Sequence, residues 1–420
     1  MTTAGVDVAP RSSARVYYGW IVLGVASAAM IGTLPGRTQG LGLITEPLLR
    51  DLQISRVAYA QMNLVATLIG GLFCLGIGRL IDRLGSRIVL TITALALGLT
   101  VLAMSQATSA AVMLVGITFT RGFGQSALSV ISLAMVGKWF RRRLTVAMAV
   151  YSVVISVGFM LAFPLVGAIV QTAGWRIAWS AIGLALVCGL APVAYLLDRS
   201  SPESIGAEVD GGGVDSSEAS TESAVHVTLG GALRSPAFWV FAAAASMYGL
   251  VASGIGLLNE SILTERGFAP DVYYRALAVT AITGLGGNFI AGALAGRVSL
   301  RSILMTALLV LAGGLIGLAH VSTEGQVMAQ AVTMGIGGGF VMVVFFSFWG
   351  RAYGRTHLGR IQGAAQIMTV LASAVGPLFL AEWSASTGSY SSAFYLLSVL
   401  VAALAVAAAF VPVPAGARTA

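Results

Sequence analysis

Charged residues are scarce in this sequence. Asp, Glu, Lys and Arg supply 10% of the 420 residues, whereas soluble domains average roughly 25%. Hydrophobic residues supply 57%, and the mean hydropathy is +0.90. The 52 glycines lie largely inside apolar runs, where small residues let transmembrane helices approach one another closely. We therefore expect lipid, and not water, to surround most of the folded chain.

Cysteine and histidine are scarcer still, which argues against a disulfide framework and a metal site. Cys74 and Cys188 each lie in an apolar stretch, so neither a disulfide framework nor a metal site is predicted. His226, His320 and His357 lack the spacing of metal ligands or of a catalytic base. No phosphate-binding loop is present to drive an ATP-powered pump. The sequence therefore predicts a protein that is not an enzyme, with no cofactor and no metal.

Long apolar runs are the dominant feature of the chain. A transmembrane helix needs about 20 predominantly apolar residues, and lipid leaves no backbone polar group unpaired. Twelve segments meet or approach this length, near residues 19–43, 57–79, 88–106, 110–137, 144–170, 177–197, 236–258, 274–296, 302–320, 327–349, 363–383 and 390–412. The sequence thus predicts an all-α membrane protein with twelve transmembrane helices.

The net charge of +8 comes from Lys and Arg residues that are unevenly divided between the two sides of the predicted membrane spans. Of the 24 Lys and Arg residues, seventeen lie in segments on one side of the predicted spans and six on the other. Loops rich in Lys and Arg stay in the cytoplasm. We therefore expect both chain termini to be cytoplasmic, in a multi-pass protein of the plasma (inner) membrane, and we expect no nucleic-acid partner.

One long polar segment interrupts the apolar runs. Residues 198–235 contain Pro202, three consecutive glycines and an acidic, serine-rich stretch, as is typical of a flexible linker. The segment is too short and polar to form the soluble module of a receptor. We expect a six-helix bundle at 1–197, a cytoplasmic linker at 198–235 and a second six-helix bundle at 236–420.

A weak internal repeat supports this division. The loop GRLIDRLGSR at 78–87 joins the second and third predicted helices, and GALAGRVSLR at 292–301 joins the eighth and ninth. The two copies share a glycine, a leucine and both arginine positions, but Gly296 stands where the first copy has Asp82. A duplicated unit predicts two pseudo-symmetric halves.

The pattern G-x-x-x-D-R-x-G-x-R at 78–87 resembles the signature loop of the major facilitator superfamily, at the same place between helices two and three. The resemblance implies the major facilitator fold and a secondary transporter that works by alternating access. It also implies a gating role for this loop, carried by Gly78, Asp82, Arg83, Gly85 and Arg87. The alternative, that the arginines only anchor the loop at the membrane surface, leaves the acid and the glycines unexplained.

Other stretches resemble the monocarboxylate and oxalate porter branch of that superfamily. They lie at 18–20, 139–143, 174–176, 202–206 and 354–360. The resemblance implies that a monocarboxylate or related organic anion is moved by symport or exchange. The other expected partners are a co-transported proton and the lipid bilayer, and the protein is expected to be a monomer.

Two departures from family patterns bear on the substrate. The branch typically carries a basic residue deep in helix eight or eleven, and this chain has none there, so anion recognition would shift to Arg121 or Arg37. The alternative function is proton-coupled drug or metabolite efflux. Efflux members usually carry Gly-Pro pairs in helix five, whereas this chain has only Gly158, Pro164 and Gly167, so uptake is favoured.

Arg121 is the main candidate for substrate binding. It lies eleven residues after Ala110 in the fourth predicted helix, which places it roughly 16 Å deep at 1.5 Å per residue. Gln125 lies four residues on and shares its helix face, so the two side chains could hold one carboxylate. An arginine satisfied by carbonyl groups or by a neighbouring helix is an equal alternative.

Arg37 follows Pro35 and Gly36 in the outer half of the first helix. These residues loosen a helix and free backbone groups to line a cavity, where Arg37 could guide anions inward. A side chain that reaches the outer headgroups is the favoured alternative.

The remaining candidates are polar groups within or beside apolar spans. The residues that could orient a solute are Tyr59, Asn63, Tyr151, Tyr248, Asn259, Asn288 and Gln366. Each by itself is more simply explained as an interhelical hydrogen bond. Glu260 is one of few acids near a span and is the candidate for proton coupling, although a residue near the outer end is often simply solvated.

Overall fold

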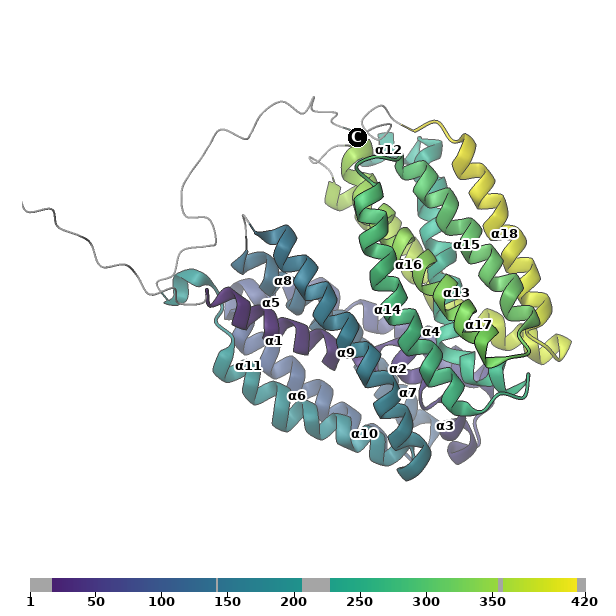
Figure 1. Cartoon of the computed structure of the whole chain (residues 1–420). Coiled ribbons are helices and arrows are strands. Elements are labelled where there is room, and N and C mark those ends of the chain that lie inside the picture. The colour runs from purple at the N-terminus through teal and green to yellow at the C-terminus, as the bar shows by residue number, and fades with distance from the viewer. Residues whose placement is uncertain (1–16, 141–142, 206–226, 354–357, 414–420) are drawn as a thin grey trace, which may run out of the picture.

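Long helices make up most of the structure, a computed structural model that describes residues 17–140, 143–205, 227–353 and 358–413 (Figure 1). In these ranges every regular element is helical, which confirms the predicted all-α class. Ten helical segments here are long and apolar enough to cross a membrane. They are Gly19–Gly36 (α1 and η1), α6 (Ser86–Ser105), α9 (Leu144–Ala173), Trp175–Leu197 (α10, η3 and α11), α13 (Pro236–Thr264), α14 (Pro270–Leu294), α15 (Leu300–His320), α16 (Glu324–Tyr353), α17 (Leu358–Thr387) and α18 (Ser391–Phe410).

The other two predicted spans are divided into shorter helices. The second consists of α4 (Arg56–Gly71) and α5 (Cys74–Leu84). The fourth consists of α7 (Ala110–Thr120), the π-helical segment η2 (Arg121–Leu128) and α8 (Ser129–Trp139). All twelve predicted spans therefore have helical counterparts. A π-helical insertion often marks a functional position, and η2 begins at Arg121.

The first span is interrupted where the sequence predicted a loosened helix. The helix α1 (Gly19–Gly32) is followed by the 3₁₀ turn η1 (Leu34–Gly36) and by α2 (Thr38–Gly42). Arg37 between them has extended backbone, with φ −85° and ψ 153°, and Pro35 has no amide to donate. A further short helix, α3 (Thr45–Leu52), was not predicted.

Several helix ends differ from the predicted boundaries. The helix α13 continues to Thr264, six residues beyond the predicted end, and α14 begins at Pro270, four residues before the predicted start. Proline favours the first turn of a helix, and apolar counting misses turns that continue beyond the hydrocarbon. The turn η4 (Pro202–Ile205) and α12 (Leu229–Leu233) lie within the predicted linker, whereas 206–226 lie outside the described residues. The boundaries at 197 and 235 stay a prediction.

Two groups of helices, one from each half of the chain, contact each other at one side of the molecule (Figure 1). We call this the distal side, and the side at which α1 begins and α11 ends the terminal side. The contacts join α2 and α3 to α13, α9 to α14, and α4 to α17. On the terminal side the ends of α5, α8 and α11 lie apart from α12 (Figure 1).

Tight backbone packing closes the distal side. A Cβ atom on Gly42 would lie 2.2 Å from the carbonyl oxygen of Gly256, so only glycine permits this approach. The Tyr273 hydroxyl donates to the carbonyl oxygen of Gln39 at 3.4 Å, and the Tyr274 hydroxyl donates to that of Leu43 at 3.3 Å. These bonds connect the two groups of helices directly.

Candidate functional site

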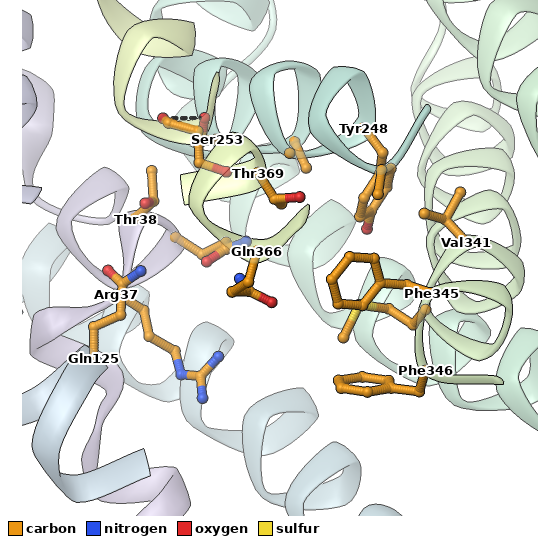
Figure 2. A pocket seen from close by; sticks show the side chains of 16 residues that line it. Arg37, Thr38, Gln125, Tyr248, Ser253, Val341, Phe345, Phe346, Gln366 and Thr369 are labelled. Atoms are coloured by element: carbon orange, nitrogen blue, oxygen red, sulfur yellow. Dashed lines mark hydrogen bonds between the residues drawn. The ribbon is translucent and has the colours of Figure 1, made fainter. Parts of the chain in front are cut away.

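A cavity of about 310 Å³ lies between the two groups of helices. Its lining comes from the break between η1 and α2, from η2, and from α13, α16 and α17. Figure 2 shows Arg37, Thr38 and Gln125 on one side of this space and Phe345 and Phe346 on the other. Both halves of the chain therefore contribute to one site.

Arg37 is the charged residue of the cavity. Its Nε donates to the Thr33 hydroxyl at 2.6 Å, its Nη2 lies 2.9 Å from the sulfur of Met30, and its guanidinium carbon lies 5.2 Å from the Phe159 ring centroid. Among the described residues no carboxylate forms an ion pair with it. The side chain lines the cavity, so the favoured placement at the outer headgroups is wrong. The extended backbone after Gly36 turns it between the helix groups instead.

Arg121 lies behind the cavity wall, with 2% of its surface exposed. Its Nη1 donates to the Gly36 carbonyl at 3.1 Å, to the Thr38 hydroxyl at 2.9 Å and to Gln125 Oε1 at 2.5 Å. Its Nη2 donates to Asn63 Oδ1 at 3.0 Å. The buried cation is thus held by neutral acceptors from the first, second and fourth spans, which matches the structural alternative considered from the sequence. Among the described residues, Thr38 and Gln125 connect it to the cavity, which both of them line.

Glycines allow these three spans to meet around Arg121. A Cβ on Gly36 would lie 2.2 Å from the Thr120 carbonyl oxygen, and one on Gly70 would lie 2.6 Å from the Arg121 Cβ. Gly122 and Gly124 are buried in the π-helical segment itself. The run Arg-Gly-Phe-Gly-Gln at 121–125 is the signal that could have indicated an irregular helix here.

Four of the ten predicted binding residues line the cavity: Arg37, Gln125, Tyr248 and Gln366. The other six, Arg121, Asn63, Tyr59, Tyr151, Asn259 and Asn288, do not. Asn63 supports Arg121, and the Tyr151 hydroxyl lies 2.6 Å from that of Ser132. Sequence reasoning did not select Gln39, Ser253, Thr369, Ser373, Phe345 or Phe346, which also line it. Hydroxyl and aromatic residues are too common in membrane helices to be distinguished without the fold.

Glu260 lies buried at the distal end of α13, with 6% of its surface exposed. Its Oε2 has no hydrogen-bond partner among the described residues. Glu46, Arg50 and Arg56 are close enough to interact with it electrostatically. Glu46 itself accepts hydrogen bonds from Arg56 Nε at 2.9 Å and Nη2 at 2.8 Å. The acid is therefore enclosed where the two groups meet, and it is not simply solvated.

The loop predicted to gate the transporter lies on the terminal side. Gly85 has φ +79°, which favours glycine, and a Cβ there would lie 2.2 Å from the Ser200 hydroxyl. Arg87 Nε donates to the Tyr195 carbonyl at 2.6 Å, and its guanidinium carbon lies 4.3 Å from the Tyr195 ring centroid.

Of the other residues predicted to gate, Arg83 is exposed. The side chain of Asp82 lies outside the described residues, and the backbone at Gly78 belongs to α5. The loop is thus anchored to the end of α11.

Asp198, one residue beyond α11, completes this anchor. Its side chain is fully buried, and Oδ2 accepts a hydrogen bond from the Ser86 hydroxyl at 2.8 Å. Burial raises the pKa of Asp198 to about 6, although the Ser86 bond and the charges of Arg199 and Arg87 oppose the shift. Sequence reasoning did not select this acid.

The sequence matches the profile of the Major Facilitator Superfamily over residues 21–377 and again over 244–420. The chain belongs to this superfamily, whose members are multi-pass membrane transporters and not enzymes. The family predicted from the loop at 78–87 is therefore confirmed, whereas the monocarboxylate and oxalate branch stays a prediction. A comparison with curated protein sequences gives no match.

Two solved structures with the same fold are of a bacterial homologue of the human lysosomal transporter Spinster. The inward-facing, occupied form has a TM-score of 0.71 at 12% sequence identity, covering 95% of this chain and 98% of that one. The inward-facing, unoccupied form has a TM-score of 0.71 at 14% identity, covering 94% and 96%. At this identity the similarity establishes the fold alone.

Proposed function

We propose that the protein carries a small organic anion across the membrane by alternating access, as a symporter or an exchanger. The observation that carries this proposal is Arg37, a cation that lines the cavity and has no carboxylate partner among the described residues. A charge at membrane depth is costly unless it has a partner or a function. An anionic solute supplies the missing partner.

The rest of the lining supports an anion over a cation. Arg37 is the one residue of formal charge among the described residues that line the cavity, and no acid faces it there. The side-chain amides of Gln39, Gln125 and Gln366 lie in the same lining and can donate hydrogen bonds to a carboxylate. A positively charged drug would meet repulsion from Arg37 without any attraction.

Arg121 serves in this proposal as a positioning residue. Its guanidinium holds Thr38, which belongs to the first span, and Gln125, which belongs to the fourth. Fixing these neighbours lowers the cost of ordering them when a solute binds. The site thus has a recognition arginine at Arg37 and a supporting arginine behind it.

The arrangement of the helices supports a rocking mechanism. The distal side is closed by Tyr273 and Tyr274, and the terminal ends diverge (Figure 1). The excess of Lys and Arg on the terminal side favours a cytoplasmic location for that side and for both termini, in the plasma (inner) membrane. We infer that the protein acts as a monomer, in which the halves at 1–197 and 236–420 rock about the cavity. In the state that opens the distal side, the loop at 78–87 closes the cytoplasmic side.

Glu260 is proposed to couple transport to a proton. It is enclosed beside the Glu46–Arg56 pair, and one of its oxygens has no hydrogen-bond donor among the described residues. A carboxyl group enclosed where two helix groups meet is a candidate for binding and releasing a proton. Opening of the distal side would expose it to water and allow it to exchange a proton.

Transport by the purified protein in vesicles tests the proposal. Uptake of lactate, pyruvate, oxalate and phenylacetate is compared with that of their neutral amides, with an inward proton gradient, with no gradient, and after preloading with the same anion. We expect uptake of at least one anion and not of its amide. Acceleration by the gradient indicates symport, and acceleration by preloading indicates exchange. Proton-driven efflux of neutral or cationic compounds without any anion transport would contradict the proposal and favour the efflux alternative.

A further inference from the structure

We propose that the transported anion is amphipathic, with one carboxylate and an apolar tail about the size of a single aromatic ring. This inference rests on the proposed function, because it assumes that Arg37 holds the anionic group. It concerns the opposite wall of the same cavity, which no step of the argument for an anion has used.

The opposite wall is apolar, and its exposed surface comes mainly from two residues of α16. Val341, Met342, Phe345 and Phe346 on α16 line it together with Tyr248 of α13. Phe346 is 61% exposed and Met342 is 44% exposed. The rings of Phe345 and Phe346 meet edge to face, with centroids 5.6 Å apart, so the largely buried Phe345 supports the exposed ring of Phe346.

The two walls have opposite chemistry. Figure 2 shows the polar groups of Arg37 and Gln125 on one side, and Tyr248, Phe345 and Phe346 on the other, with Gln366 between them. Apolar surface that faces a wet cavity is stabilised when an apolar group covers it. A solute that meets both walls must therefore carry its charge at one end only.

Cavity size and charge limit the alternatives. A volume of about 310 Å³ lies at the small end of ligand pockets, which span roughly 300–1,000 Å³, so a multi-ring solute is disfavoured. A dicarboxylate such as oxalate would bring two negative groups to a lining with one arginine. Acetate-sized anions would leave Phe346 and Met342 uncovered. A monocarboxylate with one ring satisfies both walls.

Calorimetric titration of the purified full-length protein with four probes tests the inference. Phenylacetate carries both features, phenylacetamide lacks the charge, acetate lacks the ring, and oxalate replaces the ring by a second charge. We expect phenylacetate to bind at least about tenfold more tightly than each of the others, the gain that burial of a ring readily supplies.

Substitutions at the apolar wall sharpen the test. Phe346→Ala should weaken phenylacetate binding roughly tenfold and leave acetate binding unchanged, while Phe346→Leu, which keeps apolar volume, should retain most of the affinity. Phe289→Ala is the matched control, because Phe289 is 50% exposed on α14 and does not line the cavity. Elution as a single symmetric peak with an unchanged melting temperature shows that each variant is folded.

The outcomes separate this inference from the proposed function. Acetate and oxalate binding as tightly as phenylacetate, with Phe346→Ala without effect, would overturn the amphipathic solute and leave the anion transporter standing. If phenylacetamide binds as tightly as phenylacetate, and Arg37→Gln changes the affinity for neither compound, both this inference and the proposed anion transport are overturned. Selective loss of phenylacetate affinity in Phe346→Ala supports both.

Discussion

Arg121 donates a hydrogen bond to Gln125 four residues further along the π-helical segment, and of the two only Gln125 lines the cavity. The same guanidinium nitrogen also reaches Gly36 and Thr38. The charge that looked most like a binding residue from the sequence is thus a link between spans, and Arg37, which lines the cavity, is the proposed recognition charge.

This relationship predicts different effects for the two residues. Arg121→Gln leaves the buried acceptors of Gly36 and Asn63, and the half-buried Thr38 hydroxyl, without their donor. It should therefore lower the free energy of unfolding by about 2 to 4 kcal/mol. Gln125→Ala should cost less than about 1 kcal/mol but should weaken solute binding. Thermal unfolding in detergent and anion titration check the pair. Equal stability of the Arg121→Gln variant and the wild type would contradict the linking role.

Closure of the distal side depends on Gly42. In Gly42→Ala the new methyl group would lie 2.2 Å from the Gly256 carbonyl oxygen, which is backbone and cannot rotate away. The variant should disfavour the state seen here and slow transport roughly tenfold, as a bias of about 1.4 kcal/mol would. Spin labels are placed at Gln53, an exposed residue directly after α3, and at Thr264, the exposed last residue of α13. The distances between them should be longer in Gly42→Ala than in the labelled protein that keeps Gly42.

Gly24→Ala is the matched control for this prediction. No atom outside its own helix lies within 4 Å of a Cβ at Gly24, so the same change in α1 should leave both transport and the label distances as they were. Unaltered label distances in Gly42→Ala would count against the distal closure.

Glu260→Gln should uncouple transport from the proton gradient. The amide cannot release a proton, so uptake should no longer respond to an inward gradient, whereas exchange of anion for anion should continue. Glu382→Gln offers a comparison, because Glu382 is an exposed acid on α17. Gradient-driven uptake that survives in Glu260→Gln would show that the proton is carried elsewhere.

Asp198 predicts a pH dependence of stability on the terminal side. Its pKa is raised to about 6 in the folded protein by burial, against about 3.9 in an unfolded chain. Between these values the folded state holds a proton that the unfolded state has lost. The contribution of Asp198 to stability is therefore fully present below about pH 4, and falls by up to about 3 kcal/mol as the pH rises through 6.

Asp198→Asn should remove this part of the pH dependence, because the amide does not titrate and can still accept a hydrogen bond from Ser86. The measurement is the melting temperature from pH 4 to pH 7.5. The curve of the variant should be flatter than that of the wild type and should lie above it at pH 7. Ser86→Ala, which keeps the carboxylate, should retain a downward slope with rising pH. Parallel curves for Asp198→Asn and wild type would refute the assignment.

The sequence was sufficient to predict the fold and four of the residues that line the cavity. Apolar runs and the loop at 78–87 identify the helices and the superfamily because lipid leaves few alternatives. Pro35 and Gly36 indicated the break beside Arg37. Depth along a helix, however, was a poor guide to which residues line the cavity. Arg121 is at the right depth but faces its own half of the molecule, and the rotation of a π-helical segment cannot be obtained from a 3.6-residue period.

The apolar wall could not be predicted for a different reason. Phe345 and Phe346 look like any lipid-facing pair in an apolar run, and only packing of α16 against the other helices turns them toward the cavity. Asp198 was likewise one acid among several at the start of a polar segment. Its burial follows from the approach of Ser86 at the start of α6, a contact between residues 112 positions apart.

The most direct test is anion uptake by vesicles that contain the Arg37→Gln variant. Arg37→Lys keeps the charge but loses the planar donor pair, and Arg301→Gln removes an exposed arginine at the start of α15. We predict that Arg37→Gln abolishes uptake, that Arg37→Lys retains part of it with weaker apparent affinity, and that Arg301→Gln transports like the wild type. Undiminished uptake with unchanged affinity in Arg37→Gln would contradict the account.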